Sequence, residues 1–250
     1  MRAEVIYYLC RRDIVKFLRD RQNLLASLTR PLLWILAVGF GLRASVASNT
    51  HGVDFVSFLI PGVATMSVLF SSMFSAISIV WDREFGFLKE LLVSPVPRFS
   101  IVLAKMIAAS ITSLLEVSVV LLAAPLFGAH FHPLGALVAL LVLVPFGMAI
   151  NALGIIVASR MKTFEGFGGI VNFVLQPMFF FSGALYPIEN LPRALGIVVR
   201  LNPMSYSVDL TRGLLIGVYH FPIALDIGVI VTSALLLGAT ATWSFSKMQA

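Results

Sequence analysis

Charged residues are scarce in this chain. Lys, Arg, Asp and Glu make up 12% of its 250 residues, whereas soluble globular proteins average roughly 25%. Hydrophobic residues make up 59%, and the mean hydropathy is +0.96. A soluble fold of this size could not cover its surface with so few charges, and the large apolar content argues against disorder. The composition excludes a water-soluble monomer and predicts a membrane protein.

Several chemical signatures are also missing. The single cysteine, Cys10, cannot form an internal disulfide. The chain has no Gly-Lys pair and therefore no usual P-loop for nucleotide phosphates, so ATP, if it drives the protein, must be hydrolysed on a separate subunit. We find no nucleophile motif, no histidine spacing typical of a metal site, no dense basic patch for nucleic acid and no secretory signal peptide. We expect no catalytic, cofactor-binding or metal-binding residues and no nucleic-acid partner.

Long apolar runs are what the chain does contain. A membrane-spanning helix needs roughly 20 mostly apolar residues. The first run that qualifies is the weakest, because Arg30 and Pro31 interrupt it. These runs predict an all-α, polytopic membrane protein with six spans in one permease domain, at residues 24–42, 55–81, 106–127, 133–159, 166–188 and 227–246.

The basic residues are distributed unevenly between the predicted loops. Of the 18 Lys and Arg residues, 14 lie in the N-terminal segment, the loops after the second and fourth spans, and the C-terminal tail. Basic residues are retained on the cytoplasmic side of membranes. The bias predicts that both termini are cytoplasmic, in the plasma membrane of a prokaryote.

Residues 1–22 form a predicted amphipathic helix. Its apolar side chains follow the spacing of one helical face: Cys10, Ile14, Phe17 and Leu18. The opposite face is charged: Arg12, Asp13, Lys16, Arg19 and Asp20. We expect this helix to lie flat at the headgroup level, with its cationic groups toward anionic lipid.

The loop at residues 82–98 contains a short, helix-competent stretch at 84–93, which Pro95 and Pro97 prevent from continuing. The stretch is charged at its start and carries several large apolar side chains: Phe85, Phe87, Leu88, Leu91 and Leu92. These side chains need a cover. The stretch either folds back on the bilayer surface or inserts into a groove of a partner protein.

The same loop carries a family resemblance. Its string REFGFLKELLVSPVPR is similar to the cytoplasmic coupling region of type-two ABC transporter permeases, the membrane subunits of drug, lipid and polysaccharide exporters. Three further strings match in order: FLIPGV at 58–63, ASRMKTFEGFGGIVNFVLQPMFFFSGALYPIENLP at 158–192, and LNPMSYSVDLTRGLL at 201–215. The resemblance covers nearly the whole chain and is closest to the daunorubicin- and nodulation-exporter permeases.

This resemblance implies an architecture and partners. Such a permease pairs with a second copy, in a homodimer or a heterodimer, and with two ATP-binding subunits. The N-terminal helix and the coupling loop contact those subunits, the loop through Glu84, Phe85, Gly86, Phe87, Leu88, Lys89 and Glu90. The resemblance also implies short external helices at 187–217 that dip back toward the membrane. Within them, Asp209 and Arg212 are spaced to pair on one helix face.

Glu116 is the one acidic residue expected deep in the membrane. It lies eleven residues beyond Lys105, roughly 16 Å along a helix. A charge near the midplane must pair, face the bundle interior or take up a proton, so Glu116 is either a functional carboxyl or a hydrogen-bonded structural residue. Asn151, Asn172 and Gln176 are expected to form hydrogen bonds between helices.

The aromatic residues give a weak indication of the cargo. The chain has 20 Phe and 9 Met, but 5 Tyr and 3 Trp. A lining rich in Phe and Met suits apolar or amphipathic molecules better than sugars. The sequence predicts an ATP-driven exporter of a hydrophobic or amphipathic, drug- or lipid-like substrate. The alternatives are a polysaccharide exporter, an ion-gradient transporter that uses Glu116, and a membrane scaffold protein.

Overall fold

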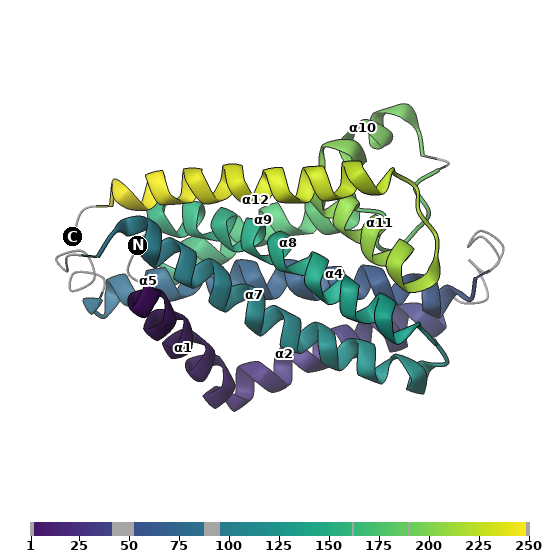
Figure 1. Ribbon diagram of the computed structural model, residues 1–250, viewed down its shortest axis with the longest axis horizontal. Helices are drawn as coiled ribbons and strands as arrows, with labels where there is room; N and C mark the ends of the chain where they lie inside the picture. The colour runs from purple at the N-terminus through teal and green to yellow at the C-terminus, as the bar shows by residue number, and fades with distance from the viewer. Residues whose placement is uncertain (1–2, 42–52, 88–95, 162, 190, 249–250) are drawn as a thin grey trace.

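The computed structural model describes residues 3–41, 53–87, 96–161, 163–189 and 191–248. Every regular element among them is a helix, as predicted. Figure 1 shows an elongated bundle in which both chain termini lie at the same end. We call this the terminal end. The end of α5 and the start of α7 also lie there, whereas α10 and α11 lie at the opposite end.

Five helical stretches are long and apolar enough to cross a membrane. In two of them the α-helix continues into a different helix type, as α2 runs into the π-helix η1 and α7 into the 3-10 helix η3. The stretches are α2 (Arg21–Trp34) with η1 (Ile35–Phe40), α4 (Phe55–Ser75) with α5 (Ile77–Glu84), α7 (Arg98–Ala123) with η3 (Ala124–Phe127), α8 (Pro133–Arg160), and α12 (Ile223–Ser246).

Helix α9 (Phe164–Phe180) is shorter than its predicted range. It has 17 residues, about 26 Å of helix, and residues 181–188 after it form turns and bends rather than the end of a span. The prediction of a helix to residue 188 was wrong because side chains from farther along the chain satisfy the last carbonyls of α9. Asn202 donates to the carbonyl oxygens of Met178 (2.6 Å) and Phe181 (3.2 Å). A sixth span remains a prediction.

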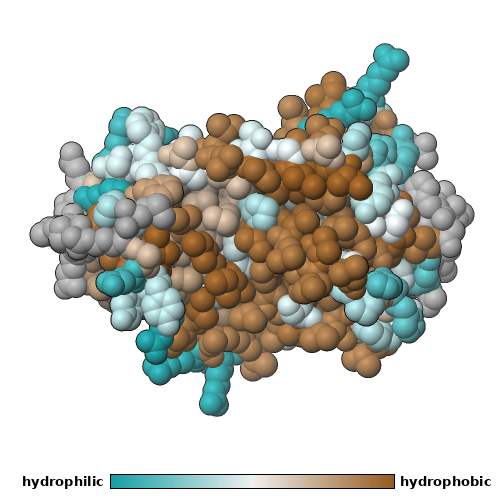
Figure 2. All heavy atoms as spheres, in the orientation of Figure 1, coloured by the Kyte–Doolittle hydropathy of each residue, from teal (hydrophilic) through white to brown (hydrophobic). Residues whose placement is uncertain are grey.

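The surface is divided as expected for a protein that crosses a bilayer. In Figure 2, hydrophobic residues form a broad central band, and hydrophilic residues gather toward both ends of the bundle. Large apolar side chains are exposed along the outer helices, including Leu122, Leu141 and Leu235. Exposure of such a band to water would be unfavourable, whereas contact with lipid chains is favourable.

The interior is centred on α4, most of whose side chains are buried between α7, α8, α9 and α11. Small residues allow the close approach of the helices. At Gly154 of α8, an added Cβ would lie 2.7 Å from the Cβ of Ala76, at the junction of α4 and α5. Asn151 of α8 donates to the carbonyl oxygen of Ser72 of α4 at 2.9 Å, the interhelical hydrogen bond that the sequence predicts for this residue.

Two short helices cover the opposite end: α10 (Arg193–Leu201) and α11 (Pro203–Ile216). The expected Asp209–Arg212 pair does not form as an exposed contact, because both residues are buried and use other partners. The Asp209 carboxylate accepts from the backbone N–H groups of His220 and Phe221. Arg212 donates to the carbonyl oxygen of Gly183 at 2.9 Å and stacks on the ring of Phe58.

Candidate functional site

The first candidate region is the turn that follows α5 at the terminal end. Helix α5 ends at Glu84, and the backbone turns at Phe85 and Gly86, where Gly86 has a φ of +79°. The predicted helix over 84–93 therefore starts too early, since this left-handed backbone favours glycine and ends a helix. Phe87 is helical again, and Leu88, Lys89 and Glu90 lie outside the described residues. Phe85 is 73% exposed.

Four charged side chains lie directly behind this turn. We name them the charge cluster: Arg12 and Asp13 of α1 (Ala3–Arg19), Asp82 of α5, and Lys105 of α7. Lys105 is only 5% exposed, and its Nζ lies 3.1 Å from Asp82 and 3.5 Å from Asp13. Arg12 lies 2.8 Å from Asp13 and 3.3 Å from Asp82.

The charge cluster corrects the expectation for the N-terminal helix. Arg12 and Asp13 were predicted on a polar face turned toward lipid headgroups, yet they face α5 and α7. Cys10 is buried, and α1 packs against α7. Burial alone would lower the pKa of Arg12, but the charges of Asp13 and Asp82 raise it above its ordinary value. The cluster is therefore held together by two cations and two carboxylates in a poorly solvated position.

Two further contacts join the end of α5 to α8 and α9. Arg83 donates to the last carbonyl oxygens of α8, those of Met161 (2.5 Å) and Ser159 (3.0 Å). The ring of Trp81 packs edge-on against Phe164 at the start of α9. A displacement of the turn after α5 would consequently be transmitted to four helices, namely α1, α7, α8 and α9.

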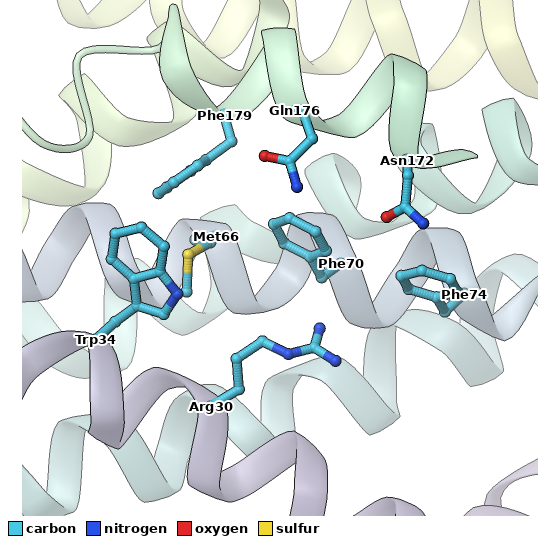
Figure 3. Close-up of a pocket in the computed structure, with 8 residues that line it drawn as sticks. All are labelled: Arg30, Trp34, Met66, Phe70, Phe74, Asn172, Gln176 and Phe179. Carbon is cyan, nitrogen blue, oxygen red and sulfur yellow. The ribbon is translucent and has the colours of Figure 1, made fainter. Parts of the chain in front are cut away.

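The second candidate region is a partly open pocket between α2, α4 and α9. Figure 3 shows Arg30 and Trp34 of α2 below it, Met66, Phe70 and Phe74 of α4 along its middle, and Asn172, Gln176 and Phe179 of α9 above it. Its volume is about 410 Å³. Asn172 and Gln176 were expected to form interhelical hydrogen bonds, but both side chains are exposed and line this cavity instead.

A second pocket of about 520 Å³ adjoins the first, and the two share Arg30, Met66, Phe70 and Phe74. It runs from Asp13 and Lys16 of α1 to Glu116 of α7. Glu116 is 3% exposed and accepts a hydrogen bond from Ser71 of α4 at 2.8 Å. We call the two pockets together the internal cavity. A space of this size, with aromatic walls and a few charged groups, is typical of a small-molecule site.

Sequence reasoning identified Glu116 and the exposed Phe85 but missed the charge cluster. Asp82 and Lys105 were assigned to a loop and its edge, where charges are ordinary. The sequence does contain an indication of the cluster: two cations and two carboxylates lie in segments that flank the predicted apolar helices. Their proximity depends on tertiary packing, because Arg12 and Asp82 are 70 residues apart.

Comparison with known proteins gives a consistent result. The profile of the family described as "ABC-2 type transporter" matches residues 4–216. Nodulation protein J of Rhizobium leguminosarum bv. viciae is 29% identical over 211 residues, covering 83% of this chain and 80% of that protein. Inner membrane transport permease YadH of Escherichia coli K12 is 26% identical over 222 residues, covering 88% and 86%. Putative transport permease ycf38 of Cyanophora paradoxa is 28% identical over 211 residues, covering 83% and 72%.

Proposed function

This chain belongs to the ABC-2 type transporter family and is a multi-pass membrane subunit of an ABC transporter, and on that premise we propose that it is the permease of an ATP-driven exporter. The exporter moves a hydrophobic or amphipathic, drug- or lipid-like molecule out of the cytoplasm. ATP is hydrolysed on separate subunits. The permease works as a dimer with a second copy or with a related chain, and the terminal end of the bundle faces the cytoplasm.

One observation carries the proposal: the turn after α5 presents an exposed aromatic ring and is joined to the bundle by charges. Phe85 is available to a partner, and Asp82 and Arg83 lie three and two residues before it. Their contacts reach α1, α7 and α8. An ATP-binding subunit that grips Phe85 would therefore move helices that border the internal cavity.

The cavity lining supports the choice of cargo. Phe70, Phe74, Phe179 and Trp34 offer ring faces to an apolar body. Asn172 and Gln176 supply a small number of hydrogen-bonding groups. A polysaccharide would need polar partners along its whole length, so an amphipathic molecule is the better fit.

Assembly tests the coupling assignment. The chain is expected to co-purify with its ATP-binding subunit, and the double variant Phe85→Ala with Leu88→Ala is expected to lose that subunit while its yield stays normal. The matched control is Leu126→Ala with Leu134→Ala, which truncates two exposed leucines at the opposite end. Normal assembly of the Phe85 and Leu88 variant would remove the turn from the interface.

Glu116 sustains one alternative, a secondary transporter in which this carboxyl carries a proton. Purified chain in vesicles, without any ATP-binding subunit, distinguishes the two. The exporter proposal expects no cargo movement under an imposed proton gradient, and cargo movement on addition of the ATP-binding subunit and ATP. Gradient-driven movement that Glu116→Gln abolishes would establish the alternative.

A further inference from the structure

Several ionisable side chains line the internal cavity, and two of them come from different helices without forming an ion pair with each other. Arg30 of α2 and Glu116 of α7 both line the larger pocket. Glu116 lies near enough to Arg30 for an electrostatic interaction, but no Arg30 nitrogen lies within 4.0 Å of a Glu116 carboxyl oxygen. A charged group within a membrane is retained where it has a function or a partner, and these two share one space.

The Arg30 side chain is free to receive an anion. It is exposed to the cavity, and its guanidinium lies 5.5 Å from the centre of the Phe70 ring. Figure 3 shows the guanidinium pointing from α2 toward α4, between the two helices. The fork of N–H groups matches a phosphate or carboxylate.

Glu116 supplies a carboxyl group to the same cavity. Ser71 donates one hydrogen bond to it at 2.8 Å, and Ser27 of α2 approaches the same carboxyl. An ionised carboxylate accepts several hydrogen bonds, so acceptor positions remain for an ammonium group.

Beside Arg30, the cavity continues along an aromatic wall, while Asp13, Lys16 and Asp20 lie at its α1 end. Ring faces of Phe70, Phe74, Trp34 and Phe179 continue beyond Arg30 toward α9. They provide a path for an alkyl or aromatic body next to the two charges. The combined volumes of the pockets suit a head group and part of a tail.

From this arrangement we infer that the internal cavity selects a zwitterionic amphiphile, whose anionic group binds Arg30, whose ammonium binds Glu116, and whose apolar body lies along the aromatic wall. The inference rests on the proposed transport function, because the bound amphiphile is the cargo only if this chain is a transporter. Its binding chemistry is independent of that function.

The test compares four single-chain amphiphiles that share one alkyl tail: an alkyl phosphoethanolamine, an alkyl phosphate, an alkylamine and an alkyl maltoside. Binding to the purified full chain is followed by the fluorescence of its tryptophans, two of which, Trp34 and Trp81, line the cavity. The phosphoethanolamine is expected to bind most tightly. Arg30→Gln should weaken the two phosphate compounds about tenfold, and Glu116→Gln should weaken the two ammonium compounds about tenfold.

Glu116→Gln conserves side-chain shape, Arg30→Gln removes the guanidinium but keeps a polar side chain, and the comparison of head groups in the unaltered chain needs no variant at all. Arg21→Gln, at the start of the same helix and outside the cavity lining, is the matched control and should change no affinity. Equal binding of all four head groups, or an equal shift of all four in either variant, would overturn the inference.

The same amphiphiles are then tested for stimulation of ATP hydrolysis in the assembled complex. Selective binding without any stimulation would contradict the proposed function and leave the cavity's selectivity intact. Equal stimulation by amphiphiles with different head groups would support the proposed function and contradict the selectivity of the cavity. The two claims can therefore fail separately.

Discussion

Lys105 illustrates how single residues are accommodated in this apolar chain. Its ammonium is almost fully buried, and two carboxylates and the hydroxyl of Ser78 surround it. Arg212 at the opposite end is equally buried, but it uses backbone carbonyls and an aromatic ring. Burying a charge costs several kcal/mol unless such partners are present. A single substitution that removes one of these partners is therefore expected to lower the stability of the fold strongly.

Asp82 is the residue in the charge cluster whose loss is expected to matter most. Asp82→Asn should lower the free energy of unfolding by about 2 kcal/mol, because it leaves Lys105 with a weaker set of partners in a buried position. Thermal unfolding in detergent measures the change. Glu4→Gln, an exposed acidic position in the first turn of α1, is the control and should be neutral.

A double variant separates the charge from general damage. Asp82→Asn combined with Lys105→Met removes both partners, so no buried ammonium is left without its carboxylate. We expect most of the lost stability to return. A double variant less stable than Asp82→Asn alone would show that the residues act independently.

At the scale of elements, α1 is docked on α7 by a buried apolar contact and by charges. Cys10 reports on that contact, since it is buried and is the only cysteine in the chain. Burial, followed by the nearby charge of Asp13, raises the pKa of the Cys10 thiol. The reactive thiolate is therefore scarce at neutral pH.

Maleimide labelling at several pH values tests this docking. Cys10 should react more slowly at pH 7 than the same cysteine in the denatured chain, and its rate should rise only at a pH above the ordinary thiol range. Asp82→Asn should speed the reaction by loosening α1. Labelling at the denatured rate under native conditions would contradict the docked position of α1.

The turn after α5 depends on the backbone of Gly86. Its φ of +79° is unfavourable for any residue with a Cβ, and an added Cβ would meet no atom of the described residues within 4 Å. Gly86→Ala therefore isolates the conformational cost, about 1–2 kcal/mol. We expect weaker assembly with the ATP-binding subunit, measured by co-purification at limiting subunit concentration.

Gly168→Ala in α9 is the matched control for Gly86→Ala. Gly168 also has open space around it, but its backbone is helical. Alanine there should be neutral or stabilise the helix by up to about 1 kcal/mol. Equal effects of the two substitutions would mean that the left-handed turn has no role in assembly.

For the whole molecule, the all-helical membrane fold followed from the sequence because a long apolar run has few other stable structures in lipid. The end of α9 did not follow, since Asn202 satisfies its final carbonyls from 24 residues away. The same limit applies to Asn172 and Gln176, whose polarity indicated an interior role but not whether they face a helix or a cavity. Contacts between distant residues determined each of these outcomes.

The most direct measurement is a site-specific cross-link between the turn after α5 and the ATP-binding subunit. In a Cys10→Ser background, Phe85→Cys carries a photoactivatable label, and Leu126→Cys, 86% exposed at the opposite end, serves as the control. The proposed exporter predicts a cross-link from position 85 that depends on the bound subunit, and none from position 126. A cross-link from position 126 alone, or none from position 85 in an assembled complex that hydrolyses ATP, would contradict it.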